Sequence, residues 1–252
     1  MGNETEQLTR SARQLLEIEA LFGGQFLPAE RCPLPPMETP TTTGGAVSRQ
    51  DKAPALAEIA DQISTCTRCG LCEGRTNTVP GEGDPDARLV FVGEGPGHDE
   101  DISGRPFVGR AGQLLARMIA AMGLTREDVF ICNVVKCRPP NNRAPATEEA
   151  AACWEYLVRQ LQVIAPEVIV TLGNPATQSL LDTRTGITRL RGQWQQLPPI
   201  GEGLEGIAVM PTFHPSYVLR QYNEDTRGKV WSDLQHVMAC LGLELPKSKP
   251  SR

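Results

Sequence analysis

Three cysteines stand at C-x2-C spacing in the stretch CTRCGLCEGR, at Cys66, Cys69 and Cys72. Thiolates at this spacing bind metal ions or iron–sulfur clusters, and one cluster-binding run, C-x2-C-x2-C-x3-C-P, begins in the same way. Thr76 stands where that run has its fourth cysteine. If these cysteines hold a metal or a cluster, a further thiolate must therefore come from elsewhere in the chain.

The chain contains eight cysteines in total. In a reducing cytosol they are better explained as ligands or small buried residues than as a disulfide framework. Cys137 directly follows a predicted strand, in KCRPP, and Cys153 lies in the next predicted helix. Both are candidate ligands. Cys132, inside the strand, is interpreted as a small buried residue, and Cys32 and Cys240 are peripheral.

A second group of residues with chemical potential follows the predicted strands. Glu94 lies in GEGPG, Asn133 ends a strand, Asn174 follows another, and His214 lies in FHPSY. A lone histidine is often only a packed or surface residue. For His214, the following proline and the position beside the other strand ends favour a functional role.

The loop GEGPG matches neither G-x-G-x-x-G nor G-x4-G-K-[ST], so a nucleotide site is unsupported. A tight turn that needs glycine is the alternative interpretation. The acidic stretch HDED that follows, beside SGRPFVG, favours a functional loop. The absence of G-x-S-x-G argues against a serine hydrolase, and the lack of compact paired ligands argues against zinc. His236, inside a terminal amphipathic helix, is interpreted as structural.

The elements that position these residues alternate between strands and helices. A parallel sheet covered by helices on both faces follows from this alternation. Ligands bind outside the carboxyl ends of the strands in such sheets, so we expect the polar strand-end residues to converge on one site. The expected strands lie within 87–97, 128–137, 166–174 and 206–216, and the helices within 112–124, 148–166 and 175–181.

The N-terminal part of the chain has a different texture. Residues 4–24 carry an apolar stripe and predict a helix, whereas 26–54 are rich in Pro, Thr and Gly, which is linker composition. We expect an N-terminal helix and linker over 1–55, a domain over 56–245 and a tail over 246–252. The arm is either a partly disordered tether or a helix that docks on a protein partner.

Length and charge set broad limits. A chain of 252 residues with 40% apolar content can bury one sizeable core, and a net charge of −5 does not exclude a local basic cleft. The first residues lack the apolar core of a secretion signal, and no window approaches the ~20 apolar residues of a membrane span. We therefore expect a cytoplasmic protein with no membrane partner, and a monomer.

Together these segments resemble the family 4 uracil-DNA glycosylases, which contain a 4Fe-4S cluster. The matching segments, in the family's order, are C-x2-C before EGRT, GEGPG, GRPFVG, N-x3-KCRPP, Cys153, RG-x-W at 191–194 and HPSYVLR. The resemblance implies a three-layer α/β/α fold with a central, mainly parallel four-stranded sheet. It also implies that Cys66, Cys69, Cys137 and Cys153 ligate the cluster. Cys72 is then surplus, either as a spare thiol or as a competitor for an iron.

The resemblance further implies a base-excision-repair enzyme that flips uracil out of DNA and hydrolyses its N-glycosidic bond. Phe107 would stack on the uracil and Asn133 would read its edge. His214, with backbone N–H groups around Gly95, would stabilise the charge that develops on the base. A carboxylate would position water, and both Glu94 and Glu100 are candidates for it.

DNA contacts are expected from the segment after His214. It looks like a loop that enters the minor groove, with Tyr217, Val218 and Leu219 as apolar candidates and Arg220 as a phosphate ligand; an ordinary helix start is the alternative. A basic edge near the same strand ends is predicted from Arg105, Lys136, Arg138, Arg143 and Arg191.

Two features depart from the family pattern, namely the N-terminal arm and a slightly lengthened QYNEDTRGK segment. The strand ends include no lysine as a Schiff-base nucleophile, so monofunctional chemistry is expected. The main alternative is a noncatalytic cluster-bearing DNA-binding module, accessory to a polymerase or repair complex. A redox protein is a further alternative, but the missing ferredoxin-type fourth cysteine speaks against it.

Overall fold

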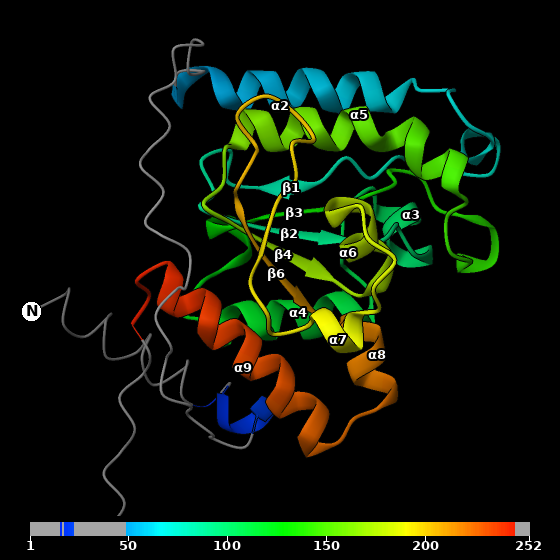
Figure 1. Cartoon of the computed structure of the whole chain (residues 1–252). Coiled ribbons are helices and arrows are strands. Elements are labelled where there is room, and N and C mark those ends of the chain that lie inside the picture. The colour runs from blue at the N-terminus through cyan, green and yellow to red at the C-terminus, as the bar shows by residue number, and fades with distance from the viewer. Residues whose placement is uncertain (1–15, 17, 23–48, 245–252) are drawn as a thin grey trace, which may run out of the picture.

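A computed structural model describes residue 16, residues 18–22 and residues 49–244 of the chain. Within these residues a six-stranded sheet has the order β1-β3-β2-β4-β6-β5 (Figure 1). Strands β3, β2, β4 and β6 run parallel, whereas β1 and β5 are antiparallel two-residue edge strands. The parallel four-stranded sheet predicted from the sequence is thus confirmed, with two short edge strands added. The strands are β1 (Glu82–Gly83), β2 (Leu89–Gly93), β3 (Phe130–Asn133), β4 (Val168–Leu172), β5 (Gln195–Gln196) and β6 (Ala208–Thr212).

Helices cover both faces of the sheet, as expected (Figure 1). Alternate residues of the buried strands face opposite layers: Leu89 and Phe91 pack with α4 (Arg110–Ala121) and α9 (Glu224–Cys240), while Val90 and Val92 pack with α5 (Thr147–Ile164). Of the described helices, none has the length and apolar character that a bilayer crossing needs. The remaining helices and turns are α2 (Arg49–Ser64), η1 (Gly70–Glu73), α3 (His98–Ser103), η2 (Arg126–Asp128), η3 (Pro140–Asn142), α6 (Asn174–Leu181), α7 (Ile187–Leu190) and α8 (Pro215–Arg220).

The strand order places a switch point at β2. The chain leaves β2, pairs β3 on one side of it, and then crosses to pair β4 on the other side. Because the two crossovers diverge at this point, a crevice opens beyond the carboxyl end of β2. The loops that begin at Gly93 and follow Asn133 both enter this crevice.

The N-terminal segment packs on this chain's own core. Ile18, Leu21 and Phe22 are buried, and the Phe22 ring stacks on Trp231 of α9 with centroids 4.8 Å apart. In this arrangement the apolar side chains at Ile18, Leu21 and Phe22 belong to the main core cluster. Most of the predicted helix over 4–24, most of the predicted linker and the tail over 246–252 lie outside the described residues.

Helix α2 begins at Arg49, inside the segment that composition predicted as linker. Asp51 lies in its first turn, where a negative charge suits the helix dipole. Ile59 and Ile63 are buried against Tyr156 of α5. This tertiary packing explains why the helix extends into a segment whose local composition does not favour it.

Candidate active site

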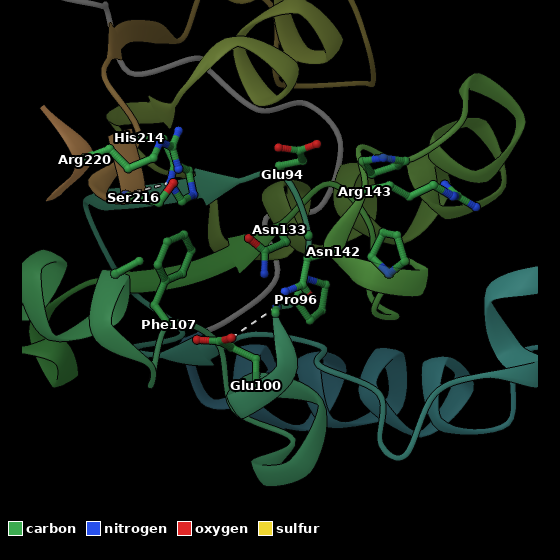
Figure 2. A pocket seen from close by; sticks show the side chains of 15 residues that line it. Glu94, Pro96, Glu100, Phe107, Asn133, Asn142, Arg143, His214, Ser216 and Arg220 are labelled. Atoms are coloured by element: carbon green, nitrogen blue, oxygen red, sulfur yellow. Dashed lines mark hydrogen bonds between the residues drawn. The ribbon is translucent and has the colours of Figure 1, made fainter. Parts of the chain in front are cut away.

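A pocket opens at the carboxyl ends of β2, β3 and β6, between the loops that follow them (Figure 2). The sequence-predicted residues that line it are Glu94, Gly95, Glu100, Phe107, Asn133, His214 and Arg220. They come from segments more than a hundred residues apart, and the parallel sheet brings them together. Lining residues that the sequence reasoning did not assign to the pocket are Pro96, Asn142, Arg143 and Ser216.

Asn133 lies at the base of the pocket, at the end of β3, and its side chain is 1% exposed. Its Oδ1 atom is buried and has no hydrogen-bond partner among the described residues. Its backbone carbonyl accepts a hydrogen bond from Lys136 Nζ at 2.7 Å, and that Nζ also donates to Gln160 Oε1 at 2.7 Å. An unpaired buried acceptor costs stability, so this one is poised for a donor that enters the pocket.

Phe107 forms one wall of the pocket in a strained conformation. Its φ of 52° lies in the left-handed region, which a bulky side chain rarely adopts. A Cβ atom on Gly93 would lie 2.5 Å from Phe107 Cζ and 2.4 Å from Asn133 Oδ1. Only glycine at position 93 therefore allows the aromatic ring and the amide to approach the strand end together.

His214 lies on the other side of Phe107, with ring centroids 5.7 Å apart. Its Nδ1 accepts a hydrogen bond from the Ser216 backbone amide at 3.1 Å and lies 2.8 Å from Ser216 Oγ. A neutral ring that accepts at Nδ1 carries its hydrogen on Nε2. Burial, together with the nearby charge of Arg220, lowers the His214 pKa to about 4. The ring is therefore a neutral donor at physiological pH.

The two candidate carboxylates have different surroundings. Glu100 Oε1 accepts from the backbone amides of Val108 at 2.9 Å and Gly109 at 3.0 Å. Its Oε2 accepts from the Gly97 amide at 3.1 Å (Figure 2). Glu100 thus fastens the loop that carries Phe107 to the loop after β2. Burial raises the Glu94 pKa, and its carboxylate has no hydrogen bond or ion pair with any described residue.

The segment after His214 forms α8 and divides into exposed and buried positions. Tyr217 is 39% exposed and packs against Phe213, and Arg220 is exposed at the pocket edge. Leu219 is partly buried against the core. Val218, however, is buried in the core, so its prediction as a DNA-contacting residue was wrong. The helix turns this side chain inward, toward α4.

Acidic side chains neutralise most of the arginines in the predicted basic edge. The spacing of residues in the sequence does not reveal these ion pairs. Arg105 pairs with Glu82, Arg143 with Glu149 and Arg191 with buried Asp233. Lys136 is 1% exposed and does not lie on the surface, because its ammonium group is held by Asn133 and Gln160. The Arg138 guanidinium instead contacts Asn142 and His98 beside the pocket.

Five cysteines surround a second, small cavity. Cys137 and Cys153 are buried, and burial raises their thiol pKa values, that of Cys153 to about 11. The Arg75 guanidinium donates to Cys137 Sγ at 3.2 Å and to the Cys66 carbonyl at 2.8 Å. The cysteines that line this cavity are Cys66, Cys69, Cys72, Cys137 and Cys153.

The chemistry of this donor set suits a cluster better than a single ion. No three His, Cys, Asp or Glu side chains in the described part of the chain converge tightly enough to bind one metal ion. In a four-iron cluster each thiolate binds a different iron, so the sulfurs need only surround a common cavity. Cys132 is buried but does not line the cavity, in agreement with its interpretation as a small core residue.

Similarity to known proteins identifies the family of this chain. The Uracil DNA glycosylase superfamily profile matches residues 80–235. The chain is 51% identical to the type-4 uracil-DNA glycosylase of Thermotoga maritima over 187 residues, which cover 74% of this chain and 94% of that protein.

Two further relatives were compared. The chain is 45% identical to the type-4 uracil-DNA glycosylase of Archaeoglobus fulgidus over 76% of this chain and 96% of that protein. It is 32% identical to a DNA polymerase of Bacillus phage SP01, over 60% of this chain but only 16% of that protein. On the profile match and the identities to the glycosylases, this chain belongs to the type-4 family of the uracil-DNA glycosylase superfamily.

Proposed function

We propose that this protein is a monofunctional uracil-DNA glycosylase that hydrolyses the N-glycosidic bond of a flipped uracil and leaves an abasic site. The observation that carries the proposal is the buried, unpartnered Oδ1 atom of Asn133 at the base of a pocket walled by Phe107 and His214. Membership in the type-4 family supports it independently.

Asn133 can read the edge of uracil. Its Oδ1 accepts the uracil N3–H while its amide NH2 donates to O4, so both uracil groups are paired in a site that excludes water. Cytosine offers the opposite pattern to this amide orientation and leaves buried polar groups unpaired. Such a mismatch discriminates strongly, because unpaired buried groups are costly. Phe107 stacks against the base, and the strained backbone at Phe107 pre-positions its ring.

His214 stabilises the charge of the leaving base. As the glycosidic bond breaks, the sugar gains oxocarbenium character and negative charge moves onto the base, chiefly toward O2. The His214 Nε2–H donates a hydrogen bond to that oxygen, and the backbone N–H groups around Gly95 assist. The Ser216 amide at Nδ1 selects the tautomer that this role requires.

Glu94 positions the attacking water and balances the cationic sugar. Its carboxylate makes no hydrogen bond or ion pair with a described residue, and Glu94 lines the pocket (Figure 2). The carboxylate oxygens of Glu100 instead accept hydrogen bonds from three backbone amides, which supports a positioning role for Glu100. Since no lysine is among the residues that line this pocket, a Schiff-base step has no nucleophile here.

The DNA-contacting surface lies beside this pocket. We propose that Tyr217 and Leu219 on α8 fill the gap that the flipped base leaves and that Arg220 contacts a phosphate. Val218 has no part in this surface because it belongs to the core.

The five-cysteine cavity is proposed to hold a 4Fe-4S cluster through Cys66, Cys69, Cys137 and Cys153. The cluster supplies cross-linking rather than catalysis, because hydrolysis of an N-glycosidic bond needs no electron transfer. The four cysteines come from the segment after α2, the loop after β3 and helix α5, so they join three separate parts of the chain. Arg75, with its hydrogen bond to Cys137 Sγ, balances thiolate charge there.

A duplex oligonucleotide that contains one uracil tests the proposal. The full chain is incubated with it, and the DNA is then treated with alkali and run on a denaturing gel. Cleavage only after alkali is expected. Removal of one donor to a developing oxyanion typically slows chemistry by about 10²–10³-fold, so His214→Ala should be slowed to that extent. Asn133→Ala removes the amide that pairs with uracil N3–H and O4 and should be slowed as well. The matched control is His98→Ala, a surface histidine outside the pocket lining.

Other outcomes identify the alternatives. Uracil-DNA binding without base release, from protein that carries iron and sulfide, would favour the noncatalytic DNA-binding module. A protein–DNA adduct trapped by borohydride would contradict monofunctional chemistry. Equal rates for His214→Ala and the wild type would remove the charge-stabilising role from His214.

A further inference from the structure

The cavity that lies between α5 and the segment after α2 contains one cysteine more than a four-iron cluster needs. Cys72 lines this cavity together with the four proposed ligands. It is neither fully buried nor disulfide-bonded, so its thiol is available for ligation. A fifth thiol in this cavity requires an explanation of its own, because a four-iron cluster takes four thiolates.

The local backbone places Cys72 directly beyond Cys69. Residues Gly70–Glu73 form the 3-10 turn η1, whose N-cap is Cys69, and the Cys72 amide bonds to the Cys69 carbonyl at 3.3 Å. Cys69 has an extended backbone (φ −148°, ψ 165°), and Cys72 lies within the turn that follows it. The thiols of Cys69 and Cys72 line the same cavity.

A cation lies beside the cavity on the side of Cys72. The Arg75 guanidinium donates to the carbonyls of Ser64 and Cys66, at 3.0 and 2.8 Å, and its positive charge interacts with Cys72 as well as with Cys137 and Cys66. The buried neighbour Leu71 packs in the core and holds the backbone of the turn beside the cavity.

We propose that Cys72 is a reserve ligand that replaces Cys69 on its iron when the Cys69 thiolate is lost. In this exchange the bond between iron and Cys69 Sγ breaks and one between iron and Cys72 Sγ forms. The Cys72 thiol gives up its proton, which Cys69 or solvent accepts, and no electron is transferred. The inference rests on the proposed cluster, but not on the glycosylase activity.

Serine variants of the full chain test this assignment, with iron and sulfide content and visible cluster absorbance as readouts. Cys72→Ser should retain a full cluster, Cys69→Ser should retain most of it, and Cys69→Ser/Cys72→Ser should lose it. The matched comparison is Cys153→Ser with and without Cys72→Ser. Cys153 comes from α5 and not from the turn that carries Cys72, so both of these variants should lose the cluster.

Two outcomes would overturn the proposal. Cluster loss in Cys69→Ser as complete as in the double variant would show that Cys72 cannot substitute. Cluster loss in Cys72→Ser alone would make Cys72 an obligatory ligand instead. If wild-type protein contains neither iron nor sulfide, the cluster proposal fails together with this one, and the uracil assay on the same preparation decides separately whether the glycosylase proposal stands.

If Cys69→Ser does not fold, a second measurement tests the proposal with all four proposed ligands in place. Wild-type and Cys72→Ser proteins are exposed to peroxide, and the decay of cluster absorbance is followed. A reserve ligand predicts a several-fold faster decay in Cys72→Ser, with equal thermal unfolding of the two proteins before treatment. Equal decay rates would refute the proposal.

Discussion

Substitution of the two pocket carboxylates should separate stability from catalysis. Glu100→Ala removes a carboxylate that accepts three backbone hydrogen bonds, from Val108, Gly109 and Gly97. Glu94→Gln removes only a charge, because this carboxylate has no protein partner in the described residues. The first change should therefore destabilise the fold around the loop that carries Phe107, and the second should slow the reaction without doing so.

The size of the Glu100 effect follows from its contacts. A hydrogen bond to a charged group contributes about 1.5–3 kcal/mol, and water replaces part of this at a half-buried site. Glu100→Ala should then cost about 2–4 kcal/mol, which corresponds to a Tm decrease of roughly 5–15 °C for a domain of this size. Glu100→Gln keeps an oxygen for Val108 and Gly109 but turns an NH2 group toward Gly97, so it should cost about 1–2 kcal/mol.

Thermal unfolding and steady-state kinetics on uracil duplex form the assay. Glu94→Gln should keep the wild-type Tm and lose about 10²-fold or more in kcat. Glu100→Ala should raise KM more than it lowers kcat, because its main effect is a loosened Phe107 loop. The reasoning would be refuted if Glu94→Gln kept the wild-type kcat while Glu100→Gln abolished kcat at an unchanged Tm.

Three further predictions concern His214, Gly93 and Phe22. Because the folded His214 pKa of about 4 lies below the ordinary value of 6.5, the unfolded chain binds more protons between these values, and stability is lost as pH falls through this window. Urea unfolding should show about 2 kcal/mol of loss between pH 7 and pH 5 that is absent in His214→Ala. Gly93→Ala should lower kcat/KM by about 10²-fold, because the added Cβ would lie 2.4 Å from Asn133 Oδ1. The control is Gly186→Ala, which should not change kcat/KM because the added Cβ meets open space. Phe22→Ala should lower the free energy of unfolding by about 3–5 kcal/mol. It should also shift the fluorescence of Trp231 to the red, because it uncovers a stacked, buried ring. An unchanged emission spectrum would contradict the packing of this segment on α9.

The convergence of Glu94, Asn133 and His214 could be predicted from the sequence because it depends only on the order and direction of the strands. Parallel strands bring their carboxyl ends to one edge whatever their side chains do. Cys137 and Cys153 could also be chosen from the strand-loop-helix order around them. Such positions depend on backbone topology, which hydrophobic periodicity reveals well.

The errors concern residues whose role depends on a distant partner. Lys136 was predicted to belong to a basic edge because it follows a strand end, yet Gln160 and the Asn133 carbonyl accept hydrogen bonds from its buried ammonium group. The partner of Arg191, Asp233, lies 42 residues further along the chain. Val218 faces the core because α8 packs on α4, a tertiary contact that local sequence does not specify.

Strand β3 and the loop after it join the two sites along one short stretch of chain. Asn133, which we propose reads the base, is followed by Lys136, which donates to the Asn133 carbonyl, and then directly by Cys137 in the second cavity. A displacement of Cys137 would therefore be separated from the Asn133 amide by only four residues along the chain. If the proposed cluster fixes Cys137, protein depleted of iron should show a reduced ratio of uracil to cytosine release before its total uracil activity falls.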